Sequence, residues 1–225
     1  MYRIGHRGAG GHAVENTAAA IRKALEMHLN MIELDVRQCA TGELVICHDR
    51  SINRITNGIG LISKLALSKI KSHQTIDGQK ILTLDEALEI VDGRCLINLH
   101  LKTADATDLI LSTIEKAIKS KKWSVRHFIL ASFNIKQLTK IKKINPKIRI
   151  GLLCLRNTVN VARRAKKLNL YSLHIYRRLM KKRGLETWRK RGIKIFAWTV
   201  NNERGINRAK KLKIDGIISD FPDRI

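Results

Sequence analysis

Short apolar runs alternate along the chain with longer segments in which apolar residues recur at helical spacing. Eight of the short runs have the apolar and β-branched content of strands. They cover residues 2–5, 31–36, 95–101, 128–131, 149–154, 171–176, 194–198 and 216–218. Helical spacing is clearest in 16–28, 83–91 and 104–121, and in the last of these Ile110 and Ile114 fall on one face.

The order of these elements predicts a closed parallel sheet. Parallel neighbours need a long crossover, usually a helix, so eight strand–helix repeats indicate an α/β fold, a TIM-type (β/α)8 barrel. The repeat is irregular only in 44–82, where 44–48 resembles a short extra strand and about 51–82 a small insertion after the second strand. This interval has few apolar residues for a core of its own, so we expect a single barrel domain over 1–225.

The charge of the chain is concentrated in its second half. The 225 residues carry a formal net charge of +25, but residues 1–118 hold 14 basic and 14 acidic side chains, whereas residues 119–225 hold 30 and 5. A hydrophobic fraction of 44% excludes a disordered chain. Aromatic residues, at 4%, are too sparse for stacking on nucleic acid, so no specific nucleic-acid partner is expected. Two interpretations of the basic half remain, a solvated surface and a weak contact with anionic membranes or other polyanions.

The lack of recognisable targeting signals and the pattern of cysteines favour a cytoplasmic location. No apolar run approaches the ~18 residues that a membrane span requires, and the first residues lack the pattern of a secretory signal. The four cysteines, Cys39, Cys47, Cys95 and Cys154, form no C-x-x-C pair and lie in or beside apolar segments. We expect buried thiols in a reducing compartment.

Residues with chemical potential cluster at the ends of the predicted strands. The first strand runs into His6 and Arg7, and the second carries Glu33 and Asp35, which share one face because they are two apart. In a barrel, the carboxyl ends of the strands form the active-site face. Two buried carboxylates on one wall are costly without a cation between them, which favours a hard divalent ion such as Mg²⁺ or Ca²⁺.

Further polar residues belong to the same rim. His48 and Asp49 end the short extra strand, and His100 and Lys102 share a face of the third main strand. Arg7 can hold a phosphate through two parallel hydrogen bonds, a lysine adds a point charge, and histidines titrate near neutral pH. The set favours phosphodiester cleavage, with one imidazole activating the nucleophile and another protonating the leaving alkoxide.

A competing pattern points to dinucleotide binding. Gly8, Gly10 and Ala13 follow a predicted strand in the order G-x-G-x-x-A, and Asp35 lies 22 positions after Ala13. The match is weak because the helical pattern begins only near residue 16 and the barrel-like repeat continues through the second half.

Several strings, in this order, resemble the glycerophosphodiester phosphodiesterase family. They are HRGAGGHAVENT, IELDV, HD, NLHLK, SFN, AWTVN and DGIISDFP, and together they span nearly the whole chain. The resemblance implies a TIM-type barrel with a small insertion that hydrolyses glycerophosphodiesters to glycerol phosphate and an alcohol, using a divalent metal. Residues that match the family's site are His6 and His48 as the acid/base pair, Arg7 and Lys102 near the phosphate, Glu33 and Asp35 as metal ligands, and Trp198 as an aromatic of the pocket. Glu15 and Asn16 match its E-N-T segment, where support of the site and helix capping both fit.

One position departs from the family pattern. The third strand of the family reads I-E-x-K, and its glutamate, a third metal ligand, is replaced here by His100. An imidazole ligand would move the metal preference from Mg²⁺ or Ca²⁺ toward Mn²⁺, Co²⁺ or Zn²⁺. Two functions therefore stay open, a phosphodiesterase with an altered metal site and a barrel that binds a phosphoester with weak or lost catalysis.

Overall fold

Eight parallel strands close into a barrel. The computed structural model describes all residues except 156–160, 162–164 and 166–167. The barrel strands are β1 (Tyr2–Gly5), β2 (Met31–Gln38), β4 (Leu96–Leu101), β5 (Phe128–Ser132), β6 (Arg149–Cys154), β7 (Ser172–Tyr176), β8 (Lys194–Trp198) and β9 (Gly216–Ser219). β1 pairs with both β2 and β9, so the sheet has no free edge among these strands. The predicted TIM-type fold is confirmed, and β3 (Leu44–Ile46) is the extra strand, antiparallel to the end of β2.

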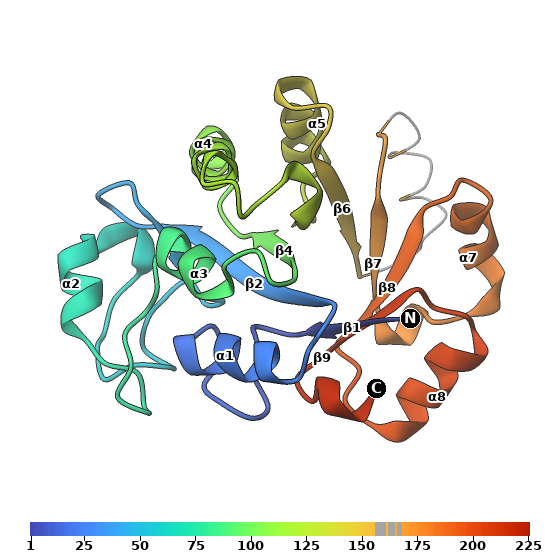
Figure 1. The fold of residues 1–225 in the computed structure, drawn as a ribbon, viewed down its shortest axis with the longest axis horizontal. Helices are drawn as coiled ribbons and strands as arrows, with labels where there is room; N and C mark the ends of the chain where they lie inside the picture. Colours follow the sequence, from blue (N-terminus) through green and yellow to red (C-terminus); the bar gives the residue numbers. More distant parts are fainter. Residues whose placement is uncertain (156–160, 162–164, 166–167) are drawn as a thin grey trace.

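Helices surround the strands on the outside (Figure 1). They are α1 (Ala18–Glu26), α2 (Leu67–Ser72), α3 (Leu84–Val91), α4 (Thr107–Lys119), α5 (Ile135–Ile144), α7 (Lys182–Arg189) and α8 (Glu203–Lys211). Local sequence explains where they begin. Thr83 and Glu86 form a reciprocal capping box at the start of α3, and Thr17 caps α1 by accepting a hydrogen bond from the backbone of Ala20.

Alternation along the strands separates two apolar layers. On β2, Ile32 and Leu34 belong to the large core between barrel and helices. Met31 belongs instead to a small cluster inside the barrel, with Phe196 and Ile218. Because Glu33 and Asp35 have the same parity as Met31, the pleat points both carboxylates into the barrel. The helices thus cover the outward, apolar face of β2, and the two carboxylates of its other face lie inside the barrel.

The insertion after β3 shares a small apolar cluster with β3 and with the residue that follows β2. Eight buried residues form the cluster: Cys39, Val45, Cys47, Ile52, Ile55, Ile62, Ile70 and Ile81. Val45 lies in β3, Cys47 comes directly after it and Cys39 directly after β2, so the insertion packs against these strands. Figure 1 shows this segment beside β2, at one side of the molecule. The single-domain organisation stays a prediction.

Membrane spans and disulfides were also predicted to be absent. Among the described residues, no helix has the length and apolarity needed to cross a bilayer. Cys39, Cys47 and Cys154 are buried and Cys95 is partly exposed, and no disulfide joins these described cysteines.

Candidate active site

A cavity of about 250 Å³ opens at the carboxyl ends of the barrel strands. All eight residues that the sequence singled out line it: His6, Arg7, Glu33, Asp35, His48, His100, Lys102 and Trp198. They lie in or directly after β1, β2, β4 and β8, or in the segment after β3, and parallel closure brings these positions to one end of the barrel.

The turn after β1 aims Arg7 at the carboxylates. Arg7 has φ of 54° and Gly8 φ of 87°, so two successive residues adopt left-handed conformations. A side chain at Gly8 would also meet Ala20, since its Cβ would lie 2.7 Å from the Ala20 carbonyl carbon. The Arg7 backbone N–H donates to Glu33 Oε2 at 3.0 Å, and Arg7 Nε lies 3.4 Å from Asp35 Oδ2. A strained turn at a functional position thus holds the guanidinium inside the cavity.

Glu33 and Asp35 share a buried wall but differ in proton affinity. Burial and the charge of Asp35 raise the pKa of Glu33 to about 7. Burial alone would raise the pKa of Asp35, but the hydrogen bond from His100 and the charge of Lys102 hold it well below its usual range. The pair therefore carries its negative charge mainly on Asp35, and a further cation beside it would favour the ionised form of both carboxyls.

Three side chains are arranged as metal ligands. One ligand atom from each of Glu33, Asp35 and His100 lies within 4.8 Å of the others. His100 Nδ1 is 3.2 Å from Asp35 Oδ1 and 3.7 Å from Glu33 Oε1. Lys102 Nζ approaches the same Asp35 oxygen at 3.2 Å. Two carboxylate oxygens and one imidazole nitrogen at this spacing fit a divalent cation.

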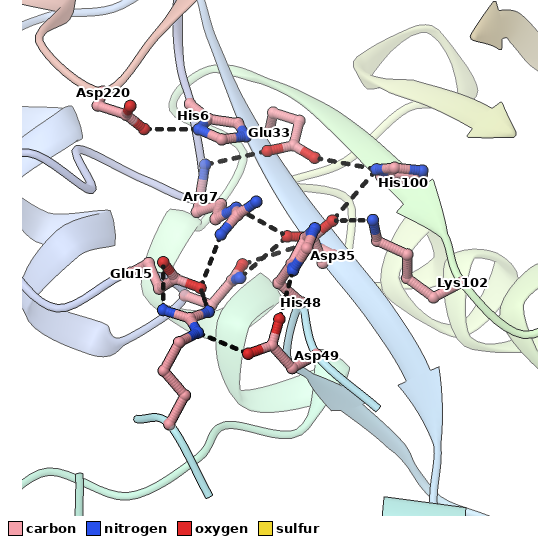
Figure 2. A network of polar contacts seen from close by, with 12 residues as sticks. His6, Arg7, Glu15, Glu33, Asp35, His48, Asp49, His100, Lys102 and Asp220 are labelled. Atoms are coloured by element: carbon pink, nitrogen blue, oxygen red, sulfur yellow. Dashed lines mark hydrogen bonds and ion pairs between the residues drawn. The ribbon is translucent and has the colours of Figure 1, made fainter. Parts of the chain in front are cut away.

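His6 and His48 are each held by a carboxylate (Figure 2). His6 Nδ1 lies 2.6 Å from Asp220 Oδ1, and His48 Nδ1 lies 2.7 Å from Asp49 Oδ1. Burial lowers the pKa of His6, but the hydrogen bond with Asp220 and the charge of Glu33 outweigh it, so the pKa is raised. Burial lowers the pKa of His48, and the nearby carboxylates do not compensate. In both rings, Nε2 remains for other contacts.

Glu15 and Asn16 support the site. Asn16 Nδ2 donates to Asp35 Oδ2 at 3.1 Å, and its Oδ1 accepts from the Asp35 backbone N–H at 3.3 Å. Glu15 Oε1 accepts from Arg7 Nη1 at 2.8 Å. Because Thr17 caps α1, Asn16 serves the site and not the helix, which settles the two interpretations of the E-N-T segment.

Sequence patterns gave no role to three residues in or beside the cavity. No site role was predicted for Asp220, although it lies in the string DGIISDFP. The same holds for Phe133, which lies in the string SFN. Phe133 packs edge-on against Trp198 with ring centroids 6.1 Å apart, and Trp198 Nε1 donates to the His174 carbonyl at 3.0 Å. His174, on β7, also lines the cavity.

The dinucleotide hypothesis is wrong. The glycine-containing segment after β1 forms turns, and α1 begins only at Ala18, so no helix N-terminus adjoins it. The sheet is also a closed barrel, and not the open sheet that the fingerprint requires.

The fold and the cavity together are typical of a TIM-barrel enzyme. A family model described as the glycerophosphoryl diester phosphodiesterase family matches residues 6–224. The chain belongs to this family of hydrolases.

Individual relatives agree with the family model. A glycerophosphodiester phosphodiesterase of Caldanaerobacter subterraneus subsp. tengcongensis is 34% identical over 99% of this chain and 95% of that protein. A phosphodiesterase structure from Oleispira antarctica, in complex with its product sn-glycerol-3-phosphate, superposes with a TM-score of 0.89 at 28% identity, covering 99% of this chain and 94% of that one. A glycerophosphodiester phosphodiesterase structure from Thermotoga maritima has a TM-score of 0.84 at 31% identity, covering 99% and 96%.

Proposed function

We propose that this protein hydrolyses glycerophosphodiesters to glycerol phosphate and an alcohol with a divalent metal ion. The observation that carries the proposal is the convergence in one cavity of a three-ligand cluster, two cations and two carboxylate-held histidines. The same groups have complementary tasks in phosphodiester cleavage, which needs charge neutralised on phosphorus oxygens and protons moved at two oxygens.

Glu33, Asp35 and His100 would hold the metal. When bound, a divalent cation supplies Lewis-acid stabilisation of charge on the phosphate oxygens. Mg²⁺ or Ca²⁺ suits the two carboxylates, whereas the imidazole of His100 also admits Mn²⁺, Co²⁺ or Zn²⁺. The raised pKa of Glu33 fits this role, since a cation there would favour its ionised form.

Arg7 and Lys102 bind the phosphate, and Trp198 forms a wall of the substrate pocket. Both cations lie at the Asp35 carboxylate, one at each oxygen. Their fixed positive charge faces the cavity, where a phosphodiester anion would exchange water for charge-assisted hydrogen bonds. Trp198 is oriented by its hydrogen bond to the His174 carbonyl and by contact with Phe133.

His6 and His48 move the protons. The raised pKa of His6 favours a protonated ring, which can donate to the leaving alkoxide. The lowered pKa of His48 favours a neutral ring, which can accept a proton from the attacking nucleophile. Their carboxylate partners, Asp220 and Asp49, fix the ring orientations through Nδ1.

Release of phosphate esters from a panel of glycerophosphodiesters tests the function. Each substrate is assayed with Mg²⁺, Ca²⁺, Mn²⁺, Co²⁺ and Zn²⁺, and after chelation. We expect turnover only with metal, and kcat lowered on the order of 10²-fold or more in His6→Ala and His48→Ala with folding unchanged. If metal-loaded wild type binds phosphoesters but turns none over, the protein is the alternative, a phosphoester-binding barrel.

The basic second half of the chain points to a second, weaker partner, an anionic membrane. Exposed lysines and arginines of α5 and α8, such as Lys136, Lys143, Lys210 and Lys211, face solvent without ion pairs among the described residues. We infer a weak, salt-sensitive contact with anionic membranes that concentrates the enzyme near lipid-derived substrates.

A further inference from the structure

The floor of the cavity contains two polar side chains that the proposed chemistry does not use. Asn98 lies on β4 and His174 on β7, and both line the cavity. In the strand register Asn98 is opposite Glu33, whereas His100 is opposite Asp35. Asn98 therefore lies one pleat deeper in the barrel than the ligand His100.

Both side chains present an unpartnered polar atom. Within the described part of the chain, five buried side-chain nitrogen or oxygen atoms have no hydrogen-bond partner. Three belong to residues of this one cavity: Arg7 Nε, Asn98 Oδ1 and His174 Nδ1. Asn98 is 1% exposed and His174 is fully buried. An unsatisfied buried group costs about 1–3 kcal/mol, so two on one floor call for a ligand that supplies the missing bonds.

The ring of His174 is held in place by its neighbours. Ser172 Oγ lies 2.8 Å from His174 Nε2, which leaves Nδ1 without a partner. Gly151 on β6 provides the room, because a Cβ there would lie 2.6 Å from Nε2. Burial lowers the pKa of His174 to about 3, so the ring is neutral and each nitrogen is either a donor or an acceptor. The floor thus offers hydrogen bonds without charge.

The apolar neighbours around the floor cannot satisfy these atoms. Ala131, Leu153 and Ile218 line the same cavity with apolar side chains. The mouth differs, since Phe133 and Leu155 are 45% and 52% exposed there. The floor therefore suits a small group with hydroxyls, whereas a larger group has room at the mouth.

We propose that Asn98 and His174 form a hydroxyl-binding subsite for the glycerol group of the substrate, with the variable alcohol directed to the mouth. The inference rests on the proposed function. A hydroxyl both donates and accepts, so one glycerol hydroxyl satisfies Asn98 Oδ1 and a neighbouring one satisfies His174 Nδ1. Recognition of the glycerol and of the phosphate is then divided between two levels of the barrel.

Calorimetric titration of the metal-loaded protein with sn-glycerol 3-phosphate and with inorganic phosphate tests this assignment. Wild type should bind glycerol phosphate more tightly. Asn98→Leu, which keeps the branched shape of the side chain but is apolar, should lower that preference about 5-fold or more, in keeping with one lost hydrogen bond, and leave the affinity for inorganic phosphate unchanged. His174→Leu should act in the same direction. Thr113→Val is the control, because Thr113 is a buried polar residue of α4 that does not line the cavity.

Stability separates a ligand-binding role from a structural one. Because Asn98 Oδ1 has no partner in the free protein, Asn98→Leu should not lower the melting temperature. If this variant does not fold, Asn98→Ala is measured in its place. Equal affinity of wild type for the two ligands, or an unchanged preference in the variants, would overturn the subsite. Absent turnover of all diesters with a retained preference for glycerol phosphate would instead refute only the proposed catalysis.

Discussion

Two histidines of the same cavity acquire opposite proton affinities from their surroundings. Burial acts against the charged form of both rings. For His6, Asp220 and Glu33 reverse the effect, whereas for His48 the carboxylates Asp35 and Asp49 are opposed by Arg7 and Lys102. Pairs of titratable groups whose pKa values are pushed apart are typical of acid/base assignments.

The pH dependence of kcat/KM should follow these directions. We expect a bell-shaped profile, with an acid limb below the free histidine pKa of about 6.5 for His48 and an alkaline limb above it for His6. Asp220→Asn removes the charge that favours protonated His6, so its alkaline limb should move to lower pH. An unchanged limb in this variant would show that another group is the acid.

His100 should control metal preference. His100→Glu replaces a neutral nitrogen donor with an anionic oxygen, so the affinity for Mg²⁺ or Ca²⁺ should rise and that for Zn²⁺ relative to Mg²⁺ should fall. Metal titration by calorimetry, without substrate, measures both. His100→Gln is the control for size, and identical affinities in wild type and His100→Glu would mean that His100 is not a ligand.

Glu33 should destabilise the metal-free protein at alkaline pH. Its pKa is raised from 4.5 to about 7 in the folded state, so folding becomes less favourable as the pH rises through that window. Glu33→Gln removes the ionisation and keeps an oxygen to accept from the Arg7 backbone. Its melting temperature without metal should exceed that of wild type, by more at pH 8 than at pH 5.5. A constant difference would contradict the linkage.

At the scale of elements, the insertion contributes an arginine to the site. Arg54 Nη2 donates to Glu15 Oε1 at 2.5 Å, and its Nε donates to Asp49 Oδ2 at 2.6 Å. Glu15 holds Arg7, and Asp49 holds His48. One side chain from the insertion therefore connects the supports of the phosphate-binding arginine and of an acid/base histidine.

Arg54→Gln should lower kcat/KM on the order of 10-fold, because Arg7 and His48 lose alignment. It should also change the pH profile. The hydrogen bond from Arg54 lowers the pKa of Asp49 to about 2, and without it the carboxylate attracts a proton on His48 more strongly, so the acid limb should move to higher pH. Lys69→Gln, on the exposed side of α2, removes the same charge from the insertion. It should change neither kcat/KM nor the pH profile. Equal effects of both variants would indicate a general charge effect.

At the scale of the whole molecule, the charge distribution separates catalysis from surface attraction. Ionic partners balance one another around the site, while the excess of +25 arises in residues 119–225. Such a field is screened over about 10 Å at 0.1 M salt, so its effects should depend strongly on ionic strength.

Co-sedimentation with vesicles measures the membrane contact. We expect binding to phosphatidylserine-containing vesicles at low salt, little binding to pure phosphatidylcholine, and release from both at high salt. Lys210→Gln with Lys211→Gln should weaken the anionic binding and leave turnover of a water-soluble diester unchanged. Equal binding to both lipids would leave a solvated basic surface as the explanation.

The sequence alone determined much of the fold and the chemistry. Alternating runs predicted every barrel strand, because burial on both faces of a parallel sheet demands short apolar segments joined by amphipathic helices. A separation of two residues predicted that Glu33 and Asp35 share one face of a strand, because side chains alternate along a strand. The same separation predicted a shared face for His100 and Lys102. A local sequence pattern is sufficient to predict the geometry wherever that geometry belongs to a single strand or helix.

Only the tertiary structure decided which distant residues meet. Asp220 holds His6 across 214 positions because barrel closure pairs β9 with β1. Arg54 reaches Glu15 because the insertion packs against β3. Asn98 and His174 lie on strands far apart in sequence, and their unpartnered atoms become apparent only when the floor between them is enclosed. Contacts between such distant residues depend on how strands and loops pack. The spacing of residues along the sequence does not contain this information.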